Sequence, residues 1–144
     1  MELWQKNVYE PLVQSYKSRR RFVVKAKRQC GKSILAILAL ITFSLQHRGS
    51  SVCIEPTRAQ CLRVQKQLVR MLQGSGLISS TNESTLTVTF ANGSEILFKS
   101  AEQGDNLRGF TVTNLLVIDE AAFIADEKTA NSDSTRIILV NCTA

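Results

Sequence analysis

The sequence lacks the cysteine and histidine patterns on which disulfide-bonded and zinc-binding domains depend. Its four cysteines, Cys30, Cys53, Cys61 and Cys142, include no Cys-x-x-Cys pair, and the chain has a single histidine. We therefore expect free thiols in a reducing compartment, and neither a disulfide framework nor a zinc site.

The sequence also lacks a hydrophobic run long enough to span a membrane. Its longest uninterrupted apolar stretch, Ile34 to Ile41, is far shorter than the roughly 20 residues that a transmembrane helix needs. The N-terminus carries Glu2 and Trp4 and no cleavable apolar segment, so we expect no secretion. With 144 residues, 44% of them hydrophobic and 21% charged, the whole chain 1–144 is expected to form one soluble globular domain.

Acidic residues are scarce in the first half of the chain. Residues 1–72 hold 14 Lys and Arg against 3 Asp and Glu, a balance of +11, whereas residues 73–144 hold 4 against 9, a balance of −5. Seven of the positive charges lie within residues 17–28. Such a run is usually a solvated surface. This run leads into a phosphate-binding motif, so the alternative is that Arg19, Arg20 and Arg21 contact DNA or a neighbouring subunit.

Two motifs carry the chemistry that the sequence does contain. Residues 26–33, Ala-Lys-Arg-Gln-Cys-Gly-Lys-Ser, follow the phosphate-loop pattern G-x-x-x-x-G-K-[ST], with Ala26 in place of the first glycine. An apolar stretch precedes them and an apolar helix follows, which is the context that this loop needs. Residues 115–120, Leu-Leu-Val-Ile-Asp-Glu, indicate a buried strand that ends in two carboxylates. In this order, the two motifs predict nucleotide binding.

Each polar residue of the two motifs has an expected role. Lys32 should reach the β- and γ-phosphates from the start of a helix, where the helix dipole favours anions. Ser33 and Asp119 are expected to hold Mg²⁺. Glu120 is the candidate general base that activates the attacking water, and its alternative role is to support the metal site indirectly. Asp119 and Glu120 could instead belong to a solvated helix start.

Apolar periodicity predicts helices that alternate with strands. We expect helices at 3–16, 32–46 and 58–73, the last with Thr57 as N-cap, and a short helical turn at 121–127. Strands are expected at 21–26, 51–55, 115–118 and 136–140, and a hairpin is expected around Asn92-Gly93. Segments 74–83 and 100–114 are expected to be loops. The predicted fold class is α/β, a P-loop NTPase domain with a mostly parallel central sheet flanked by helices.

Ligands of such sheets bind beyond the carboxyl ends of the strands. Residues 26–33, 119–120 and 142–143 each follow a predicted strand. We therefore expect the chemistry of this protein to gather at one edge of the sheet.

Taken together, these residues resemble the ATPase domain of the large terminase subunit, the DNA-packaging motor of tailed phages. The similarity rests on five segments: Arg28-Gln29-Cys30-Gly31-Lys32-Ser33, Glu55-Pro56-Thr57-Arg58-Ala59-Gln60, Asn92-Gly93-Ser94, Leu107-Arg108-Gly109 and Ile118-Asp119-Glu120-Ala121-Ala122-Phe123. The phosphate loop of this family often lacks the first glycine, as it does here.

The resemblance implies ATP and Mg²⁺ as cofactors and double-stranded DNA of any sequence as a partner. It also implies a homo-oligomeric ring, assembled with the portal and the small terminase subunit in the cytoplasm of an infected host cell, with no membrane. Gln5 would contact adenine, although a surface glutamine is the alternative. Gln29, Cys30 and Gly31 would bind nucleotide with Lys32 and Ser33. Arg28 would stabilise the transferred charge, and Thr143 would belong to the coupling motif that senses the γ-phosphate.

Two features depart from the terminase pattern. The segment between the acidic motif and the coupling motif spans only residues 121–141, and its polar part, 125–135, shows no clear helix. The chain also ends at Ala144 without the C-terminal nuclease domain, so no nuclease activity is expected. Two alternatives remain: the first motor domain of a two-domain RecA-like helicase, and a nucleotide-gated DNA-binding module with little hydrolysis alone. Arg28-Gln29 and the Asn-Gly-Ser hairpin favour terminase over helicase.

Overall fold

The computed structural model describes residues 3–14, 21–27, 32–101, 112–119 and 134–141. Within them lie the helices α1 (Leu3–Gln14), α2 (Lys32–Gln46) and α3 (Arg58–Met71). The strands are β1 (Arg21–Lys27), β2 (Ser50–Glu55), β3 (Ile78–Asn82), β4 (Thr87–Phe90), β5 (Glu95–Ser100), β6 (Leu115–Asp119) and β7 (Ser134–Asn141). No helix in the described ranges is both long and apolar enough to cross a membrane.

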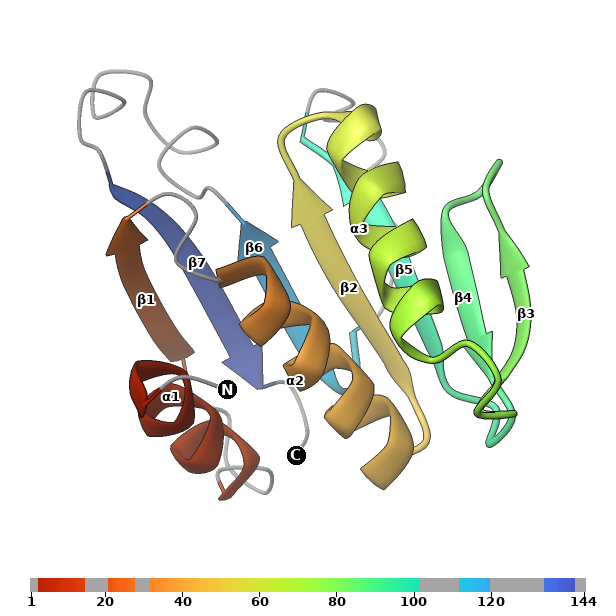
Figure 1. The fold of residues 1–144 in the computed structure, drawn as a ribbon, viewed down its shortest axis with the longest axis horizontal. Helices are drawn as coiled ribbons and strands as arrows, with labels where there is room; N and C mark the ends of the chain where they lie inside the picture. Colours follow the sequence, from red (N-terminus) through yellow and green to blue (C-terminus); the bar gives the residue numbers. More distant parts are fainter. Residues whose placement is uncertain (1–2, 15–20, 28–31, 102–111, 120–133, 142–144) are drawn as a thin grey trace.

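The strands form one mixed sheet in the order β1-β7-β6-β2-β5-β4-β3. At its centre β2 pairs in parallel with both β5 and β6, and the outer pairings are antiparallel. Five strands, β1, β6, β2, β5 and β3, still run in the same direction, which Figure 1 shows. The predicted α/β class is therefore confirmed. We call the edge where β1, β6, β2 and β5 end the carboxyl edge, and the edge where they begin the amino edge.

Strand β7 runs in the direction opposite to the one that we predicted. In the predicted direction, it would bring Thr143 to the carboxyl edge. It pairs antiparallel with β6, so that Ile137 lies beside Asp119 and Asn141 lies beside Leu115. The chain therefore leaves β7 at the amino edge. We expected the strands that precede residues 26–33, 119–120 and 142–143 to end at one edge of the sheet. This prediction is wrong for β7. A parallel strand needs a crossover, usually through a packed helix. An antiparallel strand can follow its neighbour without such a crossover, and only residues 120–133 separate β6 from β7.

The core lies between the sheet and its helices. Figure 1 shows α1, α2 and α3 on the same face of the sheet, with α2 over its centre. Helix α2 is apolar almost all round, and seven of its apolar side chains are buried: Leu35, Ala36, Ile37, Ala39, Leu40, Ile41 and Phe43. They pack against alternate residues of the strands, such as Ile96, Phe98, Leu115 and Val117. This packing fixes where α2 begins relative to the strand ends.

Three polar side chains cap the C-terminal end of α2 at the amino edge. Asn92 Nδ2 donates to the carbonyl of Ser44 at 2.7 Å, and the Ser94 hydroxyl lies 2.8 Å from the same carbonyl. Asn114 Nδ2 donates to the carbonyl of His47 at 2.8 Å. Asn92 and Ser94 belong to the turn between β4 and β5, where Gly93 has a φ of +92°. This turn therefore completes the hydrogen bonding of a helix end that lacks intrahelical partners.

Helix α3 begins as the sequence predicts, but one strand was not predicted. Thr57 is the N-cap of α3 and forms a reciprocal capping box with Gln60. The segment 74–83, expected to be a loop, contains β3. Its residues are mostly exposed and polar, so no alternation of buried side chains marks it. Backbone pairing with β4 alone makes it a strand.

Candidate active site

Helix α2 begins at Lys32, which stands at the carboxyl edge five residues beyond the last described residue of β1. The first backbone N–H groups of a helix have no intrahelical partner, and the helix dipole adds partial positive charge there. Lys32 adds a full positive charge, although its side chain is only 8% exposed. Ser33 follows in the first turn and is exposed. This helix start therefore has the features of an anion site, as predicted.

Asp119 ends β6 at the same edge and is 8% exposed. It belongs to a strand and is buried, so the alternative that it caps a solvated helix start is wrong. Its strand lies beside β2, with Ile118 paired to Ile54. Helix α2 contacts both β6 and β2. Its C-terminal end lies at the amino edge, so its start lies toward the carboxyl edge, where these two strands end.

Glu55 is a buried acid at the same edge that was not among the predicted site residues. It ends β2 and is 3% exposed. Because Ile54 pairs with Ile118, the next residues of the two parallel strands, Glu55 and Asp119, stand level with each other. The signal that identified Asp119, a short apolar strand ending in an acid, was also present in Val52-Cys53-Ile54-Glu55.

Cys53 lies behind these two carboxylates in the core. Burial raises the pKa of the Cys53 thiol well above its usual value, and the negative charges of Glu55 and Asp119 raise it further. The thiol thus keeps its proton, and Sγ donates to Glu55 Oε1 at 3.6 Å. Cys53 and Cys61 are both free and buried, which agrees with the expectation of free thiols for these two residues.

The donor set at the carboxyl edge fits Mg²⁺. This ion prefers oxygen ligands and is commonly held by one or two carboxylates together with substrate phosphates. Asp119, Glu55 and the hydroxyl of Ser33 supply oxygen from the ends of two neighbouring strands and a helix start. Among the described residues, no group of three or more His, Cys, Asp or Glu could hold a metal by itself. A phosphate oxygen of a nucleotide would add to these oxygen ligands.

Gln5 is buried in α1, so the alternative of a surface glutamine is wrong. Whether it contacts adenine stays a prediction. Several other predicted site residues lie outside the described residues: Arg19, Arg20, Arg28, Gln29, Cys30, Gly31, Glu120 and Thr143. Arg21 is the first residue of β1 and pairs with Val140 at the amino edge.

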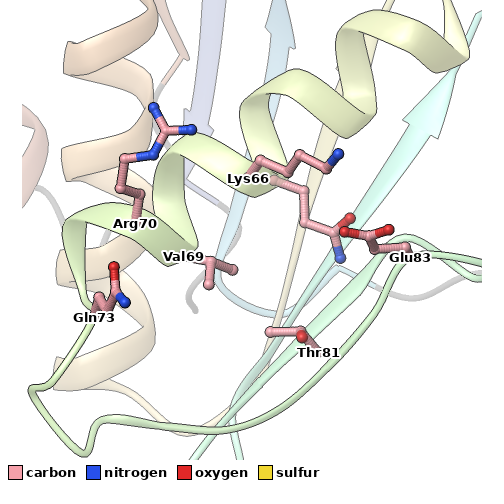
Figure 2. Close-up of a pocket in the computed structure, with 7 residues that line it drawn as sticks. Lys66, Val69, Arg70, Gln73, Thr81 and Glu83 are labelled. Carbon is pink, nitrogen blue, oxygen red and sulfur yellow. The ribbon is translucent and has the colours of Figure 1, made fainter.

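A pocket of about 350 Å³ lies away from this site, between α3 and β3. Figure 2 shows Lys66 and Arg70 on the helix side and Thr81 and Glu83 across from them. Inside it, Gln65 Nε2 donates to the carbonyls of Asn82 and Thr87 at 3.1 and 3.2 Å. None of the predicted nucleotide-binding residues lines this pocket, so its size does not make it the active site.

Comparisons with known proteins agree with this architecture. Two solved structures of the large terminase ATPase domain of Thermus phage P74-26, one of them a mutant, resemble the chain with TM-scores of 0.53 and 0.55 at 23% and 24% sequence identity. Each similarity covers 74% of this chain and 50% of the terminase chain, so the present chain spans about half the length of those structures. No curated protein matches the sequence.

At this level of identity the two structures establish a shared fold. The sequence itself matches the family model described as DEAD/DEAH box helicase over residues 4–141, which includes the phosphate-loop motif, α2, β2 and the acidic motif. Because this match runs through nearly the whole chain, the protein belongs to the DEAD/DEAH box helicase family.

Proposed function

We propose that this chain is the ATPase motor domain of a terminase large subunit, which hydrolyses Mg-ATP to drive double-stranded DNA into a capsid. One observation carries the proposal. The buried Lys32 at the start of α2 stands at the sheet edge where the buried Asp119 ends β6. A lysine at a helix start and a carboxylate at the end of a neighbouring strand suit a ligand that combines phosphate with a divalent cation.

Each residue then acts on the nucleotide from its own place. The start of α2 and Lys32 bind and orient the β- and γ-phosphates, with the helix dipole adding to the attraction. Asp119 and Ser33 hold the nucleotide's Mg²⁺, which neutralises charge on the phosphates when bound. Glu120, one residue beyond the end of β6, orients the attacking water and accepts its proton. Arg28 stabilises the charge of the transferred phosphoryl group, and Gln5 contacts adenine.

Thr143 is proposed as the coupling residue on the terminase resemblance alone. The direction of β7 does not support this role, because β7 ends at the amino edge.

The outer face of α3 supports binding to a nucleic-acid backbone. This helix has no acidic residue, and Arg63, Lys66 and Arg70 are all exposed on it. Exposed cations without base-reading neighbours favour phosphate contacts, which carry no sequence information. Arg58 is a weaker candidate, because its guanidinium donates to the carbonyls of Glu83 and Ser84 at 3.2 and 3.0 Å.

The family match favours one second candidate, the first motor domain of a two-domain helicase. Such a domain shares the phosphate loop and the acidic motif but acts on single strands with a second motor domain. ATP turnover with no nucleic acid, double-stranded DNA, single-stranded DNA and RNA separates the candidates. Terminase function predicts stimulation by double-stranded DNA of any sequence. Stimulation only by single strands would favour the helicase, and nucleotide binding without turnover would favour a binding module.

A further inference from the structure

Glu55 is a buried acid with no role in the function proposed so far. It is 3% exposed, and it ends a strand on the face of the sheet that α2 and α3 cover. Its neighbours on this strand face, Ser51 and Cys53, are buried as well. A carboxylate at such a position is costly unless a hydrogen bond or a positive charge compensates it.

Asp119 stands next to Glu55 and increases this cost. The two residues are level on adjacent parallel strands, which lie roughly 4.8 Å apart in a sheet. Both carboxylates raise the pKa of the buried Cys53 thiol, which agrees with the position that the strand register gives them. Two neighbouring carboxylates disfavour each other's ionised form, and a cation between them removes the conflict.

The positive features of the carboxyl edge are well placed to relieve this pair. Lys32 and the dipole of α2 lie at this edge, and a nucleotide would bring Mg²⁺ to it. The Cys53 thiol donates to Glu55 Oε1 at 3.6 Å and occupies part of the hydrogen-bonding capacity of that oxygen. Because a carboxylate can accept several hydrogen bonds, the bond from the thiol is compatible with hydrogen bonds from metal-bound water.

We propose that Glu55 is a second carboxylate of the metal site, a positioning residue that accepts hydrogen bonds from the waters of the nucleotide's Mg²⁺ and so holds the ion together with Asp119. This inference rests on the proposed function, because it assumes that nucleotide binds at the start of α2. It assigns to β2 a contribution that the phosphate-loop and acidic motifs do not include.

The test measures metal binding rather than turnover. Binding of a fluorescent ADP analogue to the 144-residue chain is followed during a Mg²⁺ titration and again in EDTA, and Mn²⁺ affinity is measured by electron paramagnetic resonance. We expect Glu55→Gln to raise the half-saturating metal concentration about tenfold or more, as is typical for partners of metal ligands. Nucleotide affinity in EDTA should not change. A purely structural role would instead weaken binding equally with and without metal.

Glu95→Gln is the matched control. Glu95 is a half-buried carboxylate on the neighbouring strand β5, but it lies at the amino edge and accepts from the Ser50 hydroxyl at 3.0 Å. The same chemical change there should leave the metal dependence unaltered. Glu55→Asp keeps the charge and should recover part of the metal affinity, which covers the case in which Glu55→Gln folds poorly.

A double-mutant cycle with Asp119→Asn sharpens the outcome. If both carboxylates serve one ion, the effect of the double variant should be smaller than the product of the two single fold-changes. If Glu55→Gln needs the same metal concentration as the parent chain, the role of Glu55 is overturned and the proposed function stays intact. A parent chain that binds no nucleotide would overturn both.

Discussion

Both ends of α2 meet polar side chains, but these side chains differ in kind. At the amino edge, neutral side chains complete the helix end: Asn92, Ser94 and Asn114 reach the carbonyls of Ser44 and His47. At the carboxyl edge, the polar groups are charged: Lys32, Glu55 and Asp119. The difference indicates that one end of α2 is built for stability and the other for a charged ligand.

The spacing at the amino edge supports this contrast. A Cβ atom at Gly49 would lie 2.4 Å from Thr113 Oγ1 and 2.9 Å from Asn114 Oδ1, so the chain passes too close for any side chain. The Gly49 N–H also donates to Ser94 Oγ at 3.3 Å. Tight packing and reciprocal hydrogen bonds leave no room for a ligand there. Buried charges, such as those at the opposite edge, are by themselves weak evidence for a stabilising role.

Removing the positive charge at the start of α2 should have the largest effect. Lys32→Ala is expected to abolish detectable binding and hydrolysis of Mg-ATP, because Lys32 is the only positively charged residue of α2. Isothermal titration calorimetry and a phosphate-release assay measure the two activities. Lys66→Ala, an exposed lysine on α3, is the control and should bind ATP normally. Normal turnover of Lys32→Ala would place the nucleotide elsewhere and remove the functional difference between the two ends of α2.

Glu120→Gln should keep nucleotide binding but lower hydrolysis by about two orders of magnitude or more, as expected for the loss of a general base. Single-turnover assays with saturating Mg-ATP separate the chemical step from binding. Asp119→Asn should differ by weakening the dependence on Mg²⁺. A near-normal rate for Glu120→Gln would show that water activation belongs to another residue, and Glu55 would then be the first to test.

The sequence predicted the helices of this fold well because their signals are local. The boundaries of α2 and the Thr57 cap follow from apolar periodicity and from Gln60 three residues later. The direction of β7 and the existence of β3 depend on pairing with distant strands, which no local pattern specifies. The position of Lys32 and Asp119 at one edge followed from their motifs.

Glu55 ends an apolar strand before the Pro-Thr segment that starts α3, a local pattern that does not distinguish a site residue from an ordinary strand end. Only the register between β2 and β6 reveals that Glu55 stands beside Asp119. The same limitation applies to Asn92 and Ser94. Their Asn-Gly-Ser motif predicted a turn, whereas the hydrogen bonds from that turn to the end of α2 depend on tertiary packing.

Ser94→Ala should weaken the amino edge without affecting nucleotide. Ser94 is fully buried, and its loss removes the acceptor of the Gly49 N–H, while Asn92 and Asn114 still reach the carbonyls of Ser44 and His47. We therefore expect a loss of about 1 kcal/mol in the free energy of unfolding, measured by urea denaturation. Ser80→Ala, at an exposed position of β3, should change stability much less. A large shift in Mg²⁺ dependence for Ser94→Ala would mean that the two edges are coupled.

The smallest expected effect concerns DNA and the basic residues that begin β1. Arg21 lies at the amino edge, and β1 extends for seven residues, roughly 20 Å, before the phosphate loop. This distance separates Arg21 from the nucleotide edge, so the Arg19-Arg20-Arg21 cluster is expected to contact phosphates of DNA. Replacing all three with Ser should weaken a binding that is already in the roughly micromolar range, and should flatten its salt dependence.

The salt slope decides the interpretation of this triple variant. Each lost phosphate contact should reduce the slope of log affinity against log salt by about 0.9, whereas a loss of folded protein would lower affinity without changing the slope. Fluorescence anisotropy with double-stranded DNA at several salt concentrations measures it. Arg63→Ser and Arg70→Ser test the outer face of α3 in the same way. Unchanged DNA binding with lost ATP binding would assign the cluster to the nucleotide or to a subunit interface, and the amino edge would then also have a charged function.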